Sequence, residues 1–194
     1  MRQHIAKVAS TCFFYLRKLR KIGKVLDQDS RNRLVCAFIL TRIDYCNAVF
    51  AGLPDSTLAP LQRVLHAAAR FVDNIRPRDH VTESLMSLQW LPVQERITYE
   101  LCSLMHGIVH GHAPEYLTDR AVPVADLAER CHLRLAPDGL FDTPRSRTAF
   151  GSRAFSTTGP QAWNQLPTDI CNTATYTTFK HNFKTFLFNI AYGL

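Results

Sequence analysis

Apolar side chains recur at helical spacing through the first part of the chain. In the first segment the apolar positions are Ile5, Val8, Ala9, Cys12, Leu16 and Leu19, which fall on one face of a helix. We expect this helix to end at Gly23, because glycine readily takes the left-handed conformation that closes a helix. A second helix, capped by Asp29 or Ser30, is predicted from the apolar positions Leu34, Val35, Phe38, Ile39 and Ile43.

A break at residues 52–54 separates these two helices from a third. Asp55 or Ser56 can cap this third helix. Its apolar positions are Leu58, Leu61, Val64, Leu65, Ala68 and Val72. The small side chains of residues 67–69 would let another helix approach closely. Because Pro77 ends this pattern, we expect one helical subdomain at residues 1–76 and a second subdomain at residues 81–194, with a boundary near residues 75–80.

The second subdomain has helical patterns at both ends and a proline-rich stretch between them. After a short amphipathic turn at residues 81–88, Pro92 suits a first helical turn and Trp90 can pack back on it, which predicts a helix at 92–110. Residues 111–175 are expected to be irregular, with short β pieces near Leu133–Leu135 and Ala149–Phe155. The apolar positions of a last helix, at about 177–190, are Phe179, Phe183, Phe186, Leu187 and Ile190. The predicted fold class is mainly α, with at most a short β-hairpin.

The formal net charge of +7 is concentrated at the start of this pattern. Residues 1–50 hold ten Lys or Arg against three acids, while residues 51–194 hold thirteen of each. An excess of this kind favours a polyanionic partner, either nucleic acid or an anionic membrane surface.

The basic residues of the first helix fall opposite its apolar face, because each helical residue turns by about 100°. Together with the basic group around the following turn, the candidate nucleic-acid-binding residues are Lys7, Arg17, Lys18, Lys21, Lys24, Arg31 and Arg33. Such side chains would hold phosphates without reading bases. Two other interpretations stay open: a solvated face that keeps the protein soluble, and a membrane-surface or calmodulin-binding helix at residues 4–24.

The six cysteines are scattered, with no Cys-x-x-Cys pair, and we expect reduced thiols packed among apolar residues. The first residues form an amphipathic pattern rather than the apolar core of a secretory signal. No apolar run approaches the ~20 residues needed to span a bilayer. We therefore expect an intracellular protein, cytoplasmic or nuclear, that is not secreted and has no membrane partner.

Several short strings form a specific pattern when they are taken in order. They are Ile43-Asp44-Tyr45-Cys46-Asn47; Leu61-Gln62 with Ala67-Ala68-Ala69-Arg70; Leu88-Gln89-Trp90-Leu91-Pro92-Val93 with Arg96-Ile97; Ala113-Pro114-Glu115-Tyr116-Leu117; Phe150-Gly151-Ser152-Arg153-Ala154-Phe155-Ser156; Trp163-Asn164-Gln165-Leu166-Pro167; and Phe179-Lys180 with Phe183-Lys184. The set spans most of the chain and resembles the region downstream of the catalytic palm in reverse transcriptases of non-LTR (LINE-type) retrotransposons, especially the jockey-like and chicken-repeat groups. His66 and Gln89 depart from that pattern, since the family tends to have Asn and His there.

The resemblance implies a helical thumb, which grips the template–primer duplex, followed by a carboxy-terminal domain. The partners it implies are RNA or an RNA–DNA duplex, bound without sequence specificity, and the palm of the parent polymerase. The family's catalytic aromatic-Ala-Asp-Asp turn, which holds two Mg²⁺ ions, is not in this sequence. Asp27 and Asp29 stand at an expected helix start, where capping accounts for them. We therefore expect a non-catalytic fragment without cofactor, catalytic residue or metal ligand; the alternative is a helical protein-interaction module or a non-functional relic of a truncated element.

Other side chains suggest chemistry less specifically. His106 and His110 stand one helical turn apart and could share a zinc ion, but Cys102 and His110 would lie roughly 12 Å apart along a helix. The alternative is a partly exposed polar stripe beside the core face. No Gly-x-Ser-x-Gly elbow or P-loop supports a nucleophile or nucleotide site. Trp163 and Phe155 either stack on bases or anchor an irregular loop to the core.

Overall fold

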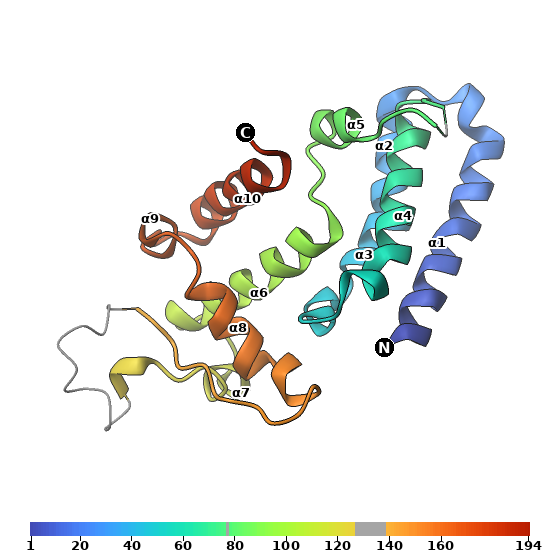
Figure 1. The fold of residues 1–194 in the computed structure, drawn as a ribbon. Helices are drawn as coiled ribbons and strands as arrows, with labels where there is room; N and C mark the ends of the chain where they lie inside the picture. The colour runs from blue at the N-terminus through green and yellow to red at the C-terminus, as the bar shows by residue number, and fades with distance from the viewer. Residues whose placement is uncertain (77, 127–138) are drawn as a thin grey trace. The chain divides into compact units, whose positions relative to one another are not determined.

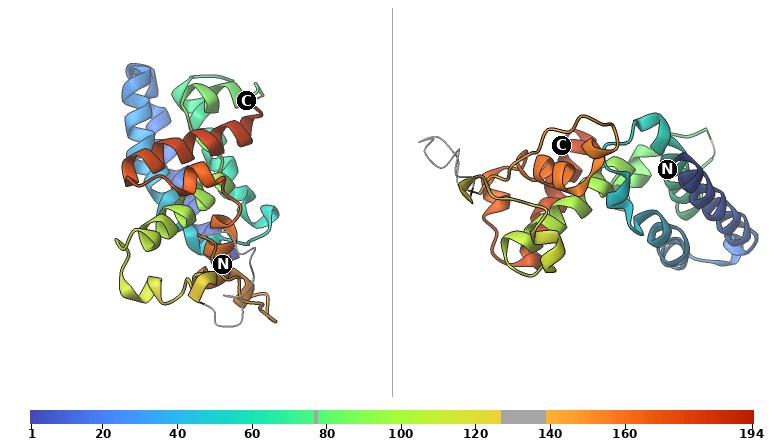
Figure 2. Two further views of the ribbon diagram at one scale, coloured as in Figure 1. Left: turned by 90° about the vertical axis from the view of Figure 1, so that its left-hand side faces the viewer. Right: turned by 90° about the horizontal axis from the view of Figure 1, so that it is seen from below.

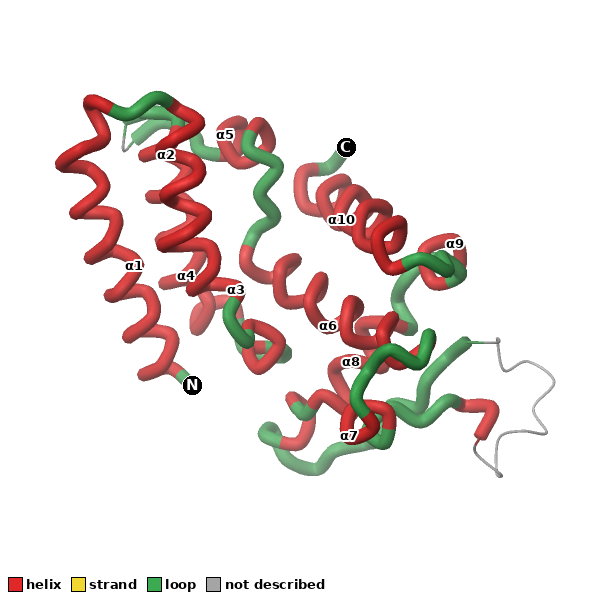
Figure 3. Tube along the Cα trace, turned by 180° about the vertical axis from the view of Figure 1, so that it is seen from behind, coloured by secondary structure: helices red, strands yellow, loops and turns green. Residues whose placement is uncertain are grey.

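The computed structural model describes residues 1–76, 78–126 and 139–194. These residues are mainly helical, as the apolar spacing predicts, and within them the β-structure is one isolated antiparallel bridge between Pro123 and Phe141 (Figures 1 and 3). The chain divides into two compact units. Unit 1 comprises residues 1–47, 53–96 and 190–194, and unit 2 comprises residues 48–52 and 97–189. This division falls at residues 96/97, inside a helix, whereas the sequence pattern placed a boundary near residues 75–80.

Unit 1 is built around three helical rods that run up, down and up. They are α1 (Arg2–Ile22), the succession of α2 (Gln28–Val35), a π turn (Cys36–Leu40) and α3 (Thr41–Asp44), and α4 (Asp55–Val72), with the short α5 (Thr82–Ser87) after them. All views show the rods side by side (Figures 1 and 2). The first rod is joined to the second through a 3-10 turn, Gly23–Val25.

The core of unit 1 is made by the apolar faces that the sequence spacing indicates. Ile5, Cys12 and Leu16 of α1 are buried, and so are the predicted positions of α4. Ala68 and Ala69 are fully buried, and α1 lies against α4 along its length, so the expected close approach at the alanine run is confirmed. Trp90 is buried, and its carbonyl oxygen accepts a hydrogen bond of 2.6 Å from the Tyr192 hydroxyl.

The ends of these helices differ from the sequence expectation. Gly23 has φ −60° and ψ −23°, a right-handed conformation, so the predicted left-handed closure is wrong. Glycine instead leaves room for a neighbouring ring, because a Cβ atom at this position would lie 2.6 Å from Cε2 of Phe71 and one of the two would have to shift. Asp27, not Asp29 or Ser30, caps α2 by accepting a 3.3 Å hydrogen bond from the Ser30 amide. α4 follows Pro54 without a side-chain cap, so the caps expected from Asp55 or Ser56 are also wrong.

Two apolar positions assigned to the core are on the surface. Phe38 is 39% exposed because it lies in the π turn, where the 3.6-residue spacing that placed it does not hold. Ile190 is 60% exposed near the end of α10, although Phe179, Phe183 and Leu187 earlier in that helix are buried as expected.

Unit 2 contains most of the remaining helices. These are the greater part of α6 (Val93–Val109), α7 (Glu115–Thr118), the 3-10 turns Val124–Asp126 and Gly151–Arg153, α8 (Phe155–Trp163), α9 (Thr168–Cys171) and most of α10 (Tyr176–Tyr192). The β piece expected at Ala149–Phe155 is wrong, since this segment leads through a 3-10 turn into α8. The sequence pattern did not predict α8, because this helix contains Gly159 and Pro160 and both residue types commonly break helices. The expected β piece at Leu133–Leu135 lies outside the described residues.

The core of unit 2 is an aromatic cluster. Trp163 of α8 is 2% exposed and lies with ring centroids 5.9 Å from Phe179 of α10. Its Nε1 donates a 3.3 Å hydrogen bond to the Gly139 carbonyl oxygen. Asn164 exchanges two hydrogen bonds with the backbone of Phe141, at 3.0 and 2.8 Å. Trp163 therefore anchors the loop segment at residues 139–141 to the core, and Phe155 is half-buried.

Candidate nucleic-acid interface

The outer face of α1 carries cations with no acid among them. The burial of Ile5, Ala9, Cys12, Leu16 and Leu19 fixes which side of α1 faces the rest of unit 1. Lys7, Arg17, Lys18 and Lys21 are all exposed, as the helical spacing requires. The first acidic residue of the chain is Asp27, beyond the end of α1, so none of these charges has a carboxylate partner on its own helix. The outer face therefore carries a positive strip, with Lys7 near the start of α1 and Arg17, Lys18 and Lys21 near its end.

The helix dipole explains only part of this charge. Arg20 and Lys21 lie in the last turn of α1, where cations favourably compensate the negative helix end. That effect fades within one turn, so it does not account for Lys7 or Arg17. Arg17 and Lys21 stand four residues apart and Lys18 and Lys21 three apart, and each such like-charged pair destabilises a helix by roughly 0.2–0.5 kcal/mol. A bound polyanion would remove this repulsion.

Exposed aromatic rings adjoin the strip. Phe14 is 45% exposed, and the Lys18 ammonium lies 4.7 Å from its ring centroid. The ring of Tyr15 stacks on Phe38 with centroids 5.6 Å apart and planes at 19°. The Arg42 guanidinium lies 4.7 Å from the Tyr15 ring centroid. We call Phe14, Tyr15 and Phe38 the aromatic patch. Cations interleaved with exposed rings are typical of surfaces that hold nucleic acid without reading its sequence.

A shallow groove extends this surface toward the start of α1. It has a volume of about 500 Å³ and runs between α1 and α3. Its lining residues are His4, Lys7, Val8, Thr11, Thr41, Arg42 and Tyr45. Lys7 thus lies beside Arg42 of a different helix, which sequence spacing along α1 did not indicate.

The three other predicted basic residues have different surroundings. Lys24 is exposed in the 3-10 turn that follows α1. Arg31 is half-buried, and its guanidinium donates to the Leu26, Phe71 and Val72 carbonyl oxygens at 3.2, 3.4 and 3.0 Å. Arg33 is exposed and forms a 2.7 Å ion pair with Asp29. Arg31 therefore has a structural role at the end of α4, and the charge of Arg33 is compensated by Asp29.

Sequence spacing missed several residues that the fold brings to this side of unit 1. Arg42 reaches the aromatic patch from α3, and Arg70 reaches the end of α1 from α4. Arg20 belongs to the basic run of α1, which the sequence shows. Which neighbours its side chain meets depends on where α4 packs, and the sequence does not show that. The sequence pattern misplaced Phe38, because its apolar side chain predicted a core position although the ring lies on the surface.

The histidines of α6 belong to the core of unit 2. His106 is 2% exposed, so the expected partly exposed polar stripe is wrong for this residue. Its Nε2 donates a 2.8 Å hydrogen bond to the Thr173 carbonyl oxygen, and the His110 Nδ1 donates a 3.0 Å bond to the His106 carbonyl oxygen. The two rings stack with centroids 4.0 Å apart. Among the described residues, no cluster of three or more His, Cys, Asp or Glu is arranged to hold a metal ion.

The five described cysteines are free thiols; four of them lie in surroundings that suppress their reactivity, and Cys46 is exposed. Burial raises the pKa of the Cys12 thiol to about 11, and burial also raises the pKa of Cys36, Cys102 and Cys171. A thiol is nucleophilic as the thiolate, so these side chains are predominantly in the unreactive form near neutral pH. Cys131 lies outside the described residues.

Comparisons of this chain with protein-family models, with curated proteins and with solved structures give no match. Within the described residues, every helix is too short or too polar to cross a lipid bilayer.

Proposed function

We propose that this chain is a non-catalytic carboxy-terminal part of a LINE-type RNA-directed DNA polymerase, and that the outer face of α1 holds RNA or an RNA–DNA duplex through its phosphates. The family origin rests on the ordered strings of the sequence. The binding function rests on one observation: the acid-free α1 buries its apolar face and leaves Lys7, Arg17, Lys18 and Lys21 exposed.

A face that served solubility alone would have no need of this arrangement. Interspersed charges of both signs keep a surface soluble and avoid like-charge repulsion along the helix. The observed strip instead concentrates one sign and adjoins aromatic rings. Phosphate contacts of this kind position a nucleic acid without sequence specificity. Their affinity falls steeply as the salt concentration rises, because the release of counterions on binding then becomes less favourable.

The test is a fluorescence-anisotropy titration of labelled RNA and of an RNA–DNA duplex at several salt concentrations. We expect binding at low salt, and we expect the triple variant Arg17→Ala, Lys18→Ala, Lys21→Ala to bind more weakly. Its log–log salt slope should fall by about one unit for each phosphate contact that is lost.

A matched control separates local contacts from total charge. Arg120, Arg145 and Arg147 are exposed residues of unit 2, and replacing these three by alanine removes the same formal charge. That variant should keep the wild-type salt slope. If the wild type and the α1 variant, both folded by circular dichroism, have equal affinity and slope, the proposal is overturned.

The aromatic patch favours a second candidate, a protein-interaction module. Phe14 and Phe38 are 45% and 39% exposed, and clustered surface rings are common at protein interfaces. In that case the partner of unit 1 would be a protein such as the parent palm, and replacing Phe14 and Phe38 would leave RNA affinity unchanged.

The proposal also implies that the isolated chain has no polymerase activity. Nucleotidyl transfer needs carboxylates that hold two Mg²⁺ ions, and the sequence has no Asp-Asp pair. Template-dependent nucleotide incorporation by the pure chain on a primed RNA, above a no-protein control, would contradict the non-catalytic assignment.

A further inference from the structure

A basic pocket opens at the end of unit 1 where α1 ends, α2 begins and α4 ends. Its volume is about 670 Å³. The described residues that line it are Arg20, Gly23, Lys24, Arg31, Ala67, Arg70, Phe71, Asn74 and Ile75. Four of these are cations and none is acidic. Three rods contribute to it, and Arg70 lies 39 to 50 positions along the sequence from the other cations.

Helix ends compensate only a minority of this charge. α1 and α4 both end at the pocket, and each carboxyl-terminal helix end carries roughly half a negative charge. Two such ends offset about one of the four cations. Two nearby carboxylates bind neutral donors: Asp73 accepts a 2.8 Å hydrogen bond from the Gln28 amide, and Asp79 accepts a 3.1 Å bond from the Arg76 backbone. Within the described residues neither forms an ion pair with a cation of the pocket. The pocket therefore has a surplus of positive charge.

One donor in this pocket is buried and has no acceptor. Arg70 Nη2 donates to the Asp79 carbonyl oxygen at 3.2 Å, but Arg70 Nε is buried and makes no hydrogen bond to any described residue. Leaving a buried donor of a charged group unpaired costs about 1–3 kcal/mol or more, so a movement of the Arg70 side chain that brought Nε to an acceptor would be favourable. The side chains of Arg20 and Lys24 likewise have no hydrogen bond or ion pair within the described part of the chain.

The pocket is held in shape by the fold. Three hydrogen bonds to carbonyl oxygens, two of them at the end of α4, hold the Arg31 guanidinium in place. The Phe71 ring lies where a Cβ at residue 23 would be. The arginine fork matches the oxygens of a tetrahedral phosphate group, while lysine supplies a mobile point charge. A fixed Arg31 beside more mobile cations is an arrangement suited to an oxyanion.

We infer that this pocket binds one phosphate group, through Arg20, Lys24 and Arg70, with Arg31 as a fixed positive wall. The identity of the carrier rests on the proposed function: the phosphate is a terminal monoester or an internal diester of the nucleic acid held by α1. The binding of the phosphate group itself does not depend on that assignment.

The first experiment observes Arg70 directly with inorganic phosphate as the probe. In ¹H–¹⁵N spectra of the full chain, the Arg70 Nε–H resonance should shift with saturation when phosphate is added at constant ionic strength. Sodium chloride at the same ionic strength should leave it in place. If chloride and phosphate cause equal shifts, or if phosphate causes none, the inference is overturned.

Variants then test the residues of the pocket. Arg20→Ala should weaken phosphate binding about tenfold, and Arg70→Lys should weaken it although the charge is kept, because lysine lacks the planar fork of guanidinium donors. Arg63→Ala, which removes an exposed cation of α4 that lies outside both the pocket lining and the α1 strip, is the matched control and should bind phosphate as the wild type does. If Arg20→Ala and Arg63→Ala have the same effect, the site is only a diffuse positive field and the inference fails.

A third arm identifies the kind of phosphate. Two RNA oligonucleotides of the same sequence are used, one with a 5′-phosphate and one with a 5′-hydroxyl end. Each is titrated into the protein with bound inorganic phosphate, and the Arg70 Nε–H resonance reports how well it displaces the phosphate. Preference for the phosphorylated end assigns a terminal monoester, and equal competition assigns an internal diester. Phosphate binding that persists while the α1 triple variant binds RNA normally would refute the α1 interface and leave the pocket standing.

Discussion

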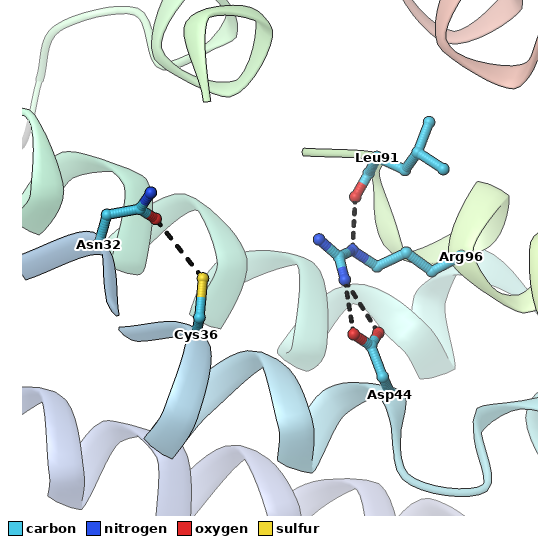
Figure 4. A network of polar contacts seen from close by, with 5 residues as sticks. All are labelled: Asn32, Cys36, Asp44, Leu91 and Arg96. Carbon is cyan, nitrogen blue, oxygen red and sulfur yellow. Dashed lines mark hydrogen bonds and ion pairs between the residues drawn. The ribbon is translucent and has the colours of Figure 1, made fainter. Parts of the chain in front are cut away.

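Arg96 binds both carboxylate oxygens of Asp44 through a single nitrogen. Its Nη1 donates to Oδ1 at 3.0 Å and to Oδ2 at 2.8 Å, while Nε donates to the Leu91 carbonyl oxygen at 2.8 Å (Figure 4). Asp44 is the last residue of α3, and Arg96 lies in the first turn of α6, 52 positions later. Both residues lie in strings that carry the family resemblance. Within unit 1, this pair ties the end of the second rod to the segment that leads into α6.

This pair predicts a measurable loss of stability when it is broken. The Arg96 side chain is 14% exposed, so Arg96→Ala leaves the Asp44 carboxylate and the Leu91 carbonyl without their donor. We expect the free energy of unfolding to fall by about 2–3 kcal/mol, measured by urea denaturation. Asp44→Asn, at a more exposed position, should have a smaller effect. Arg33→Ala breaks an exposed ion pair and serves as the control, which should change little. Equal effects of Arg96→Ala and Arg33→Ala would contradict the prediction.

The two tryptophans lie in different units, because Trp90 belongs to unit 1 and Trp163 to unit 2. Both are buried, so Trp90→Ala and Trp163→Ala should each lower the free energy of unfolding by about 3–5 kcal/mol. Trp163→Phe keeps most of the ring volume and loses only the bond to the Gly139 carbonyl, so its effect should be smaller. Wild-type unfolding midpoints in both alanine variants would show that the rings are not structural anchors.

His106 predicts a pH dependence of stability. Burial is the main cause that lowers the pKa of His106, opposed by its hydrogen bond to Thr173, with the neighbouring His110 and His112 lowering it further. A histidine whose pKa is lower in the folded state than in the unfolded state stabilises the fold while it is neutral. That contribution is fully present above the unfolded pKa of about 6.5 and is lost as pH falls from there through the folded pKa.

The measurement is urea denaturation of the wild type and of His106→Gln between pH 7.5 and 4.5. Glutamine does not titrate and can still donate to the Thr173 carbonyl oxygen. The wild type should lose stability on acidification more steeply than the variant. His66, whose pKa burial also lowers, remains in both proteins and supplies the residual slope. Parallel pH profiles would show that His106 does not titrate differently in the two states.

The aromatic patch predicts which form of nucleic acid α1 prefers. Unpaired bases can stack on exposed rings, whereas duplex bases are already stacked. Phe14→Ala with Phe38→Ala should therefore weaken binding of single-stranded RNA by about tenfold, corresponding to about 1.4 kcal/mol, and affect duplex binding less. Phe13→Ala is the control, because Phe13 is 37% exposed on the same helix but makes no ring or cation contact within the described residues. Unchanged affinity for single strands would favour a protein partner for the patch.

The sequence by itself determined the helical character of the chain and the buried faces of its long helices. The apolar spacing from Ile5 to Leu19 and from Leu58 to Val72 specifies one face each, because helical geometry relates residues only three or four positions apart. The same local rule placed Lys7, Arg17, Lys18 and Lys21 outward. The same spacing predicted Phe179 as a core residue, whereas for Trp163 the sequence left base stacking and anchoring open until the burial of its ring decided for the core.

Only the tertiary structure decided what each basic side chain meets. Lys24 and Arg31 stand seven residues apart in one basic segment, yet Lys24 is exposed while Arg31 holds carbonyl oxygens at the end of α4, 40 and 41 positions away. Arg20 and Arg70 share a pocket, and His106 is buried against Thr173, 67 positions later. Such pairings depend on how rods pack over long sequence separations, and a spacing rule that covers one or two helical turns does not contain that information.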